Sequence, residues 1–193
     1  MIDVVGYFGL ALVLARLPTL LALWCRASLT TLCMVWLITA VIVLMPWKGM
    51  SVVYFVRGVL GDLSMATLTY LVLVYYQLLV KGIRHQPSWK LSLVLVVLLG
   101  TLYASTTGYL EYDLYSWGYQ PQVLLVLAFA LMAWAWQENR LLALAWLTGV
   151  IAFALGFSSS VNFWDALFDP YLFLGSVFVP PSLPGIGVRG EGL

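Results

Sequence analysis

Long apolar runs alternate with short polar breaks along most of the chain. Each run is rich in Leu, Val and Ala and is bounded by charged residues, Pro or Gly. A helix of about 20 residues spans a bilayer, and runs of this kind are typical of membrane-spanning helices. The pattern predicts six transmembrane helices, at residues 4–24, 28–47, 58–80, 91–108, 121–137 and 141–158.

A seventh apolar stretch, residues 164–182, carries Asp165, Asp169 and Pro170 in its first half. It is predicted to be either a short last span or a helix lying at the outer membrane surface. The following tail, residues 180–193, is rich in Pro and Gly and is expected to be loosely ordered. The predicted fold is thus an all-α polytopic bundle over residues 1–179, with six spans and a seventh short or interfacial helix.

Composition supports a membrane location. Of the 193 residues, 63% are hydrophobic and 9% are charged, and the mean hydropathy is +1.00. The chain has too few polar residues to cover the surface of a soluble fold. A net charge of +1 carries no nucleic-acid signature. We therefore expect an integral membrane protein that contacts lipids and does not bind nucleic acid.

Basic residues in short loops set the expected orientation. Lys81, Arg84 and Lys90 place the connection after the third predicted helix in the cytoplasm, and alternation then places the N-terminus outside. Acids played no part in this argument, yet most of them fall on the outer side. The outer acids are Asp3, Asp62, Glu111, Asp113, Asp165 and Asp169.

Two charged residues lie near the outer end of the third predicted helix. Arg57 and Asp62 are five residues apart, a spacing that is poor for a pair on one helical face. Each is expected to meet a partner on another helix, either as a structural pair or in a functional site. We expect Arg57, Asp62, Asp165 and Asp169 to converge into one outward-facing polar cluster.

Two pairs of acids could bind a ligand or take part in a reaction. Glu111 and Asp113 lie in a loop dense in Tyr and Trp, where they are either a ligand or acid/base pair or solvated residues beside an aromatic belt. Asp165 and Asp169, at i and i+4, should share one helical face and repel each other unless a cation, Arg or Lys relieves them. The alternative is a capped helix at the interface.

Arg16 lies in the middle of the first predicted helix, where a charge costs roughly 3 kcal/mol. It should therefore face the bundle. Judged by depth, Glu138 is a better partner for it than Asp62, if the Arg16 side chain reaches inward. A structural anchor and a contact with substrate or a lipid headgroup both remain open.

Several chemistries are disfavoured by residue content. His85 is the only histidine, which argues against bis-histidine haem, a Ser–His protease and a His-ligated zinc site. Cys25 and Cys33 form no CxxC motif, and no nucleotide-binding fingerprint is present. We predict no cofactor and no metal site.

Two stretches carry a resemblance to known membrane proteins. The run RGVLGDLSMATLTYL resembles the membrane domain of lipoteichoic-acid-synthase-like phosphoglycerol or phosphoethanolamine transferases. The run NFWDALFDPYLF resembles the end of small proteobacterial inner-membrane proteins. The resemblance implies an outward-facing surface at Arg57 and Asp62 and a bacterial inner-membrane location. It implies no catalytic residue, because the large external catalytic domain of those transferases has no counterpart here.

The expected function is therefore that of a non-enzymatic accessory or scaffold subunit. Its outer polar face would bind a membrane protein partner, a second copy of the chain or an envelope lipid. The alternative is a small transporter or membrane enzyme that uses the outer carboxylates as a proton or cation site.

Overall fold

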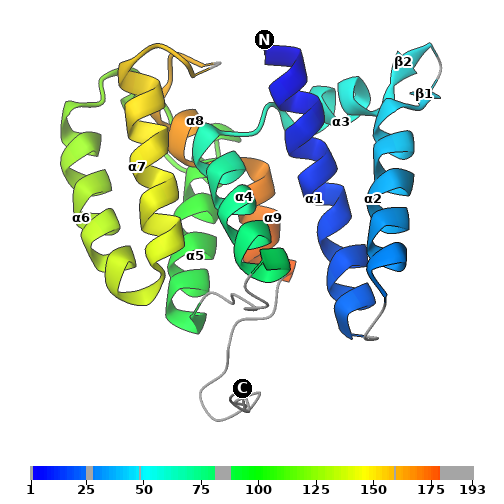
Figure 1. Cartoon of the computed structure of the whole chain (residues 1–193). Helices are drawn as coiled ribbons and strands as arrows, with labels where there is room; N and C mark the ends of the chain where they lie inside the picture. Colours follow the sequence, from blue (N-terminus) through cyan, green and yellow to red (C-terminus); the bar gives the residue numbers. More distant parts are fainter. Residues whose placement is uncertain (1, 25–27, 48, 81–87, 159, 179–193) are drawn as a thin grey trace. The chain divides into compact units, whose positions relative to one another are not determined.

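The computed structural model describes residues 2–24, 28–47, 49–80, 88–158 and 160–178 (Figure 1). Within these ranges the chain forms nine α-helices, one 3-10 turn and one short β-hairpin, which confirms the all-α prediction. The chain divides into two compact units, Met1–Leu63 and Ser64–Leu193. A single bundle over residues 1–179 stays a prediction, and the predicted tail lies outside the described residues.

The first unit is a helical hairpin closed at one end by a short helix. Its elements are α1 (Ile2–Trp24), α2 (Leu29–Leu44), β1 (Pro46–Trp47), β2 (Met50–Ser51) and α3 (Val52–Leu60). α1 and α2 pack against each other, and α3 contacts both of them (Figure 1). The two strands pair antiparallel between α2 and α3. Tyr7 of α1 bonds to the hydroxyl of Ser51 at 2.8 Å, which fixes the end of the hairpin to α1.

The second unit contains four longer helices and two short ones. Its elements are α4 (Met65–Val80), α5 (Trp89–Thr106), the 3-10 turn η1 (Ser116–Tyr119), α6 (Gln122–Glu138), α7 (Arg140–Ala154), α8 (Phe163–Leu167) and α9 (Pro170–Phe178). α7 packs against α4, α6 and α8, and α9 packs against α5 (Figure 1). The core lies between these helices and includes Leu99, Ala135, Trp146 and Phe163.

The third predicted span, residues 58–80, is not one helix. α3 ends at Leu60, and α4 begins only at Met65. Gly61 between them has a φ of +77°, a conformation that costs other residues steric strain. The hydroxyl of Ser64 then accepts a hydrogen bond from the N–H of Thr67 at 3.0 Å, which caps the start of α4.

The seventh apolar stretch, residues 164–182, is also broken. α8 ends at Leu167 and α9 begins at Pro170. Proline disfavours the helical conformation in the residue before it, so the helix cannot run through Asp169. The prediction of one helix here is wrong, and Asp165 and Asp169 do not share a helical face.

One residue connects α6 to α7. Asn139 is 2% exposed, and its side-chain oxygen accepts a hydrogen bond from the N–H of Leu142 at 3.1 Å. Its amide nitrogen donates to the hydroxyl of Tyr70 on α4, at 3.3 Å. The same side chain therefore caps α7 and ties the α6–α7 hairpin to α4.

Helix length supports fewer membrane spans than the sequence pattern predicts. Among the described residues, α5 is the one helix long and apolar enough to cross a membrane by length and composition. Shorter apolar stretches of 10–17 residues are Gly6–Arg16 within α1, Thr30–Leu44, Met65–Val80, Gln122–Glu138 and Arg140–Ala154. Length alone therefore does not support six full spans.

Gly149 allows α8 to approach α7. A Cβ atom at this position would lie 2.6 Å from the carbonyl oxygen of Ala166, which belongs to backbone and cannot rotate away. We expect Gly149→Ala to lower the free energy of unfolding by about 1–3 kcal/mol, the usual cost of overpacking. Gly100→Ala is the matched control, because a Cβ at Gly100 on α5 meets no atom within 4 Å. Equal melting midpoints of the two variants in one detergent would contradict this packing.

Candidate functional site

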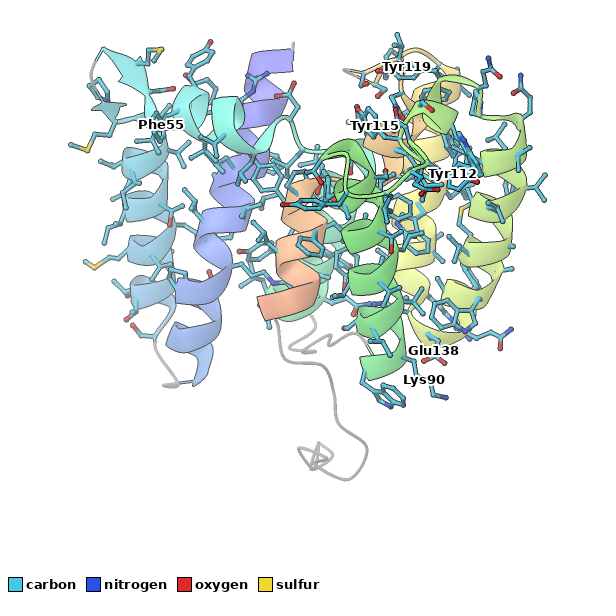
Figure 2. The ribbon with its side chains drawn as sticks, turned by 180° about the vertical axis from the view of Figure 1, so that it is seen from behind. Phe55, Lys90, Tyr112, Tyr115, Tyr119 and Glu138 are labelled. Atoms are coloured by element: carbon cyan, nitrogen blue, oxygen red, sulfur yellow. The ribbon has the colours of Figure 1, made fainter. Side chains whose placement is uncertain are left out.

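The two ends of the second unit differ in chemical character. Figure 2 shows Tyr112, Tyr115 and Tyr119 at one end and Lys90 and Glu138 at the opposite end. The aromatic end is formed by the segment between α5 and α6, together with α8. It holds four of the five acids among the predicted site residues, so it is the candidate functional site of this unit.

Asp169 fastens the starts of two helices at this end. It is 3% exposed, and one of its carboxylate oxygens accepts the N–H of Ser64 at 2.6 Å, just before α4. The other oxygen accepts the N–H of Leu172 at 2.7 Å, in the first turn of α9. The first N–H groups of a helix have no partner within the helix, and an Asp at the N-cap satisfies them. Asp169 is therefore a cap shared by the starts of α4 and α9.

The environment of Asp169 shifts the pKa of its carboxyl group in two opposite directions. Burial raises the pKa of Asp169, because the charged form loses its hydration. Hydrogen bonds from the N–H groups of Ser64 and Leu172 and from the hydroxyls of Thr67 and Ser64 lower it in part. The carboxylate is thus held by backbone donors and hydroxyls.

Asp165 is held by a tyrosine. The hydroxyl of Tyr115 donates to the Asp165 carboxylate at 2.8 Å. Burial raises the pKa of Tyr115, and the hydrogen bond to Asp165 raises it further, so the phenol keeps its proton at neutral pH. Hydrogen-bond donors therefore hold both carboxylates, the Tyr115 hydroxyl for Asp165 and the N–H groups of Ser64 and Leu172 for Asp169.

Asn162 and Trp164 attach the segment before α6 to α8. The side chain of Asn162 caps α8 by accepting the N–H of Trp164 at 2.9 Å, and donates to the carbonyl of Tyr115 at 3.0 Å. The indole N–H of Trp164 donates to the carbonyl of Leu114 at 3.0 Å. Gly118 is required here, because a Cβ atom at that position would overlap the side chain of Asn162.

Asp113 and Glu111 lie in the segment between α5 and α6. Asp113 accepts the N–H groups of Tyr115 and Ser116 at 3.0 and 3.2 Å, so its carboxylate stabilises the turn that leads into η1. Glu111 is exposed. The residues around them are exposed aromatics, with Tyr109 at 87% and Tyr112 at 73%.

In the first unit, Arg57 and Asp62 pair with each other, contrary to the expectation from their spacing. The Nε atom of Arg57 donates to Asp62 at 2.5 Å, and both side chains are partly covered. The spacing rule applies to two residues within one helix. It does not apply here, because α3 ends at Leu60, between Arg57 and Asp62, and Gly61 has a positive φ. The Arg57 guanidinium also lies over the Tyr54 ring and against Gly6 of α1. Convergence of this pair with Asp165 and Asp169, which belong to the other unit, stays a prediction.

Arg16 lies midway along α1 and is partly buried. Its Nε atom is buried without a hydrogen-bond partner among the described residues, and the same holds for the hydroxyl of Thr19 one turn later. Pairing of Arg16 with Glu138, which belongs to the second unit, stays a prediction.

No group of three or more His, Cys, Asp or Glu residues arranged to hold a metal ion occurs within the described ranges. Comparison of the chain with protein-family models, curated proteins and solved structures gives no match. The resemblance of one short stretch to transferase membrane domains, and of the other to small proteobacterial inner-membrane proteins, therefore stays an expectation.

Sequence reasoning missed the residues that attach the segment between α5 and α6 to α8. Tyr115 and Trp164 lie among many aromatic residues that a membrane belt explains equally well. Asn162 was recognisable as a possible helix cap, because it precedes an apolar helix start. Its second bond, to the carbonyl of Tyr115, joins residues 47 positions apart, and no local pattern encodes it.

Removal of the Asp169 carboxylate should loosen α4 and α9 together. We expect Asp169→Ala to cost about 1 kcal/mol for each of the two caps it removes. Asp169→Asn keeps one acceptor oxygen, so its loss should be about half as large. Thermal melting in detergent gives the total, and hydrogen exchange at the starts of both helices locates it. Glu111→Ala is the control, and a melt of Asp169→Ala as high as that of the control would refute the shared cap.

Proposed function

We propose that this chain is an integral membrane protein in which α1, α2, α4, α5, α6 and α7 cross the bilayer. The exposure of apolar side chains along the helices carries this proposal. On α2, Leu37, Val41 and Leu44 are 66%, 59% and 65% exposed. On α6, Val123 and Val126 are 65% and 69% exposed. Apolar faces of this extent need a lipid or protein cover.

The lengths of the shorter helices are compatible with crossing a membrane when the interfacial residues at their ends are counted. α2, α4, α6 and α7 have 15–17 residues, which corresponds to about 22–26 Å. The hydrocarbon core of a bilayer is about 30 Å thick. Local thinning of the bilayer and interfacial aromatic residues accommodate a difference of this size at modest cost.

The charges of the second unit support an orientation. Lys90 and Arg140 begin α5 and α7 at one end, whereas Glu111, Asp113 and Asp165 lie at the other. By the positive-inside rule, the basic end is cytoplasmic. This orientation agrees with an N-terminus outside, and we propose a bacterial inner membrane as the location.

Within this frame we propose an accessory or scaffold subunit whose outward-facing end binds a partner protein or an envelope lipid. Asp113, Asp165 and Asp169 each accept hydrogen bonds from the protein itself, so they act as parts of the structure. They hold in place a segment whose exposed side chains are aromatic. Tyr and Trp are enriched where proteins bind each other. These features favour binding over a transporter or enzyme that uses the carboxylates as a proton or cation site.

The orientation predicts opposite labelling of the two ends of the second unit. Single cysteines replace Glu111 and Gln137, both exposed, in a chain whose own cysteines are changed to Ala. An impermeant maleimide should label Glu111→Cys in intact cells and label Gln137→Cys only after the cells are opened. Labelling of Gln137→Cys in intact cells would reverse the orientation.

The subunit proposal predicts a stoichiometric partner, either another membrane protein or a second copy. The tagged chain is purified in mild detergent, and the mass of the complex is measured. Tyr109→Ala with Tyr112→Ala should reduce the yield of the complex several-fold, because these side chains are exposed and can contact a partner. Gln137→Ala, at the other end of α6, is the control.

A monomer that shows cation-dependent transport alone in liposomes would overturn the subunit proposal in favour of the transporter alternative.

A further inference from the structure

α3 exposes the wrong face for a helix in water. It separates its apolar and polar side chains more strongly than the other described helices of nine or more residues do. Its outward face carries Tyr54, Phe55 and Val59, which are 46%, 59% and 70% exposed. The side chain of Arg57, its one charge, is only 17% exposed. A surface helix in water turns its charges outward and its apolar residues inward.

The charge of Arg57 is held within the first unit. Asp62 neutralises it at 2.5 Å, and the guanidinium lies 5.9 Å from the centre of the Tyr54 ring. On its other side, the Nη1 atom lies 3.2 Å from where a Cβ of Gly6 would be. An arginine paired and packed in this way does not need contact with bulk water, so the outer face of α3 is left apolar.

The place of α3 in the first unit matches the depth at which lipid tails meet headgroups. α3 follows the hairpin at the end of α2, and Figure 2 labels Phe55 at this end. The 16 residues of α2 cover about 24 Å, most of a hydrocarbon core. The exposed apolar surface of α2 continues to its end through Leu44 and Met45. α3 thus extends a surface that already faces lipid in the proposed arrangement.

We propose that α3 is an interfacial helix that inserts Tyr54, Phe55 and Val59 into the headgroup–acyl boundary of the outer leaflet. Helices of this kind lie in the membrane plane with an apolar face buried about 5–10 Å into the boundary. Their aromatic residues favour this layer. The inference rests on the proposed membrane location and adds a lipid contact at a segment that lies mostly between the predicted spans 28–47 and 58–80.

The test measures which molecules reach the outer face of α3. Nitroxide labels are attached to Phe55→Cys and Val59→Cys in the full-length chain, with Cys25 and Cys33 changed to Ala. The protein is reconstituted into vesicles of phosphatidylethanolamine and phosphatidylglycerol. Collisions with oxygen report hydrocarbon, and collisions with a nickel chelate report water. Labels at Val41→Cys on α2 and at Glu111→Cys are the lipid and water references.

We expect both α3 labels to show an oxygen-to-nickel accessibility ratio several-fold above the Glu111→Cys label and a shallower depth than the Val41→Cys label. Nickel accessibility equal to that of Glu111→Cys would place α3 in water and overturn the inference. Low accessibility to both reagents would also overturn it, because protein would then cover this face. If the Val41→Cys label itself reports water, the membrane location fails, and this outcome is distinct from the other two.

Discussion

The unpaired N–H groups at helix starts are the constraint on which the rest of this fold depends. In an apolar environment these groups have no water to bond, and each one left open costs several kcal/mol. The chain supplies a short polar side chain at most of its helix starts. The side-chain acceptors are Ser28 for α2, Ser64 for α4, Ser88 for α5, Asn139 for α7, Asn162 for α8 and Asp169 for α9.

Several of these caps make a second bond, and the second bonds set the tertiary structure. Asn139 reaches Tyr70 of α4, Asn162 reaches the backbone of Tyr115, and Asp169 reaches the backbone of Ser64. Apolar packing between similar Leu- and Val-rich helices has little directional preference. Buried polar bonds with fixed partners select one arrangement from many apolar ones. The fold is therefore specified by a few polar contacts in a chain that is otherwise mostly apolar.

The sequence predicts the longer helices well and the short ones poorly. α5 and α6 lie within two residues of their predicted positions, because charged and turn-forming residues mark both ends of their apolar runs. The spans predicted at 58–80 and 164–182 fail for a shared reason. A hydropathy pattern does not register that Gly61 can adopt a positive φ or that Pro170 stops a helix at the residue before it.

The candidate site was likewise predicted only in part from the sequence. The sequence identifies the acids as candidates, since charges stand out in an apolar chain. It does not give their roles. The pairing of Arg57 with Asp62 depends on a break inside a predicted helix, and the role of Asp169 depends on a bond to Ser64, 105 residues earlier. Such a bond is set by the packing of the helices of the second unit, which no local pattern describes.

The distance along the sequence between Ser64 and Asp169 also affects the order in which the second unit is completed during synthesis. Chains emerge from the ribosome at about 5–20 residues per second, so the acceptor for the Ser64 N–H is made on the order of 5–20 s after Ser64 itself. During that interval the Ser64 N–H lacks its acceptor in the folded protein. The first helix of the second unit is thus completed by one of the last residues of that unit to be made, because Asp169 directly precedes α9.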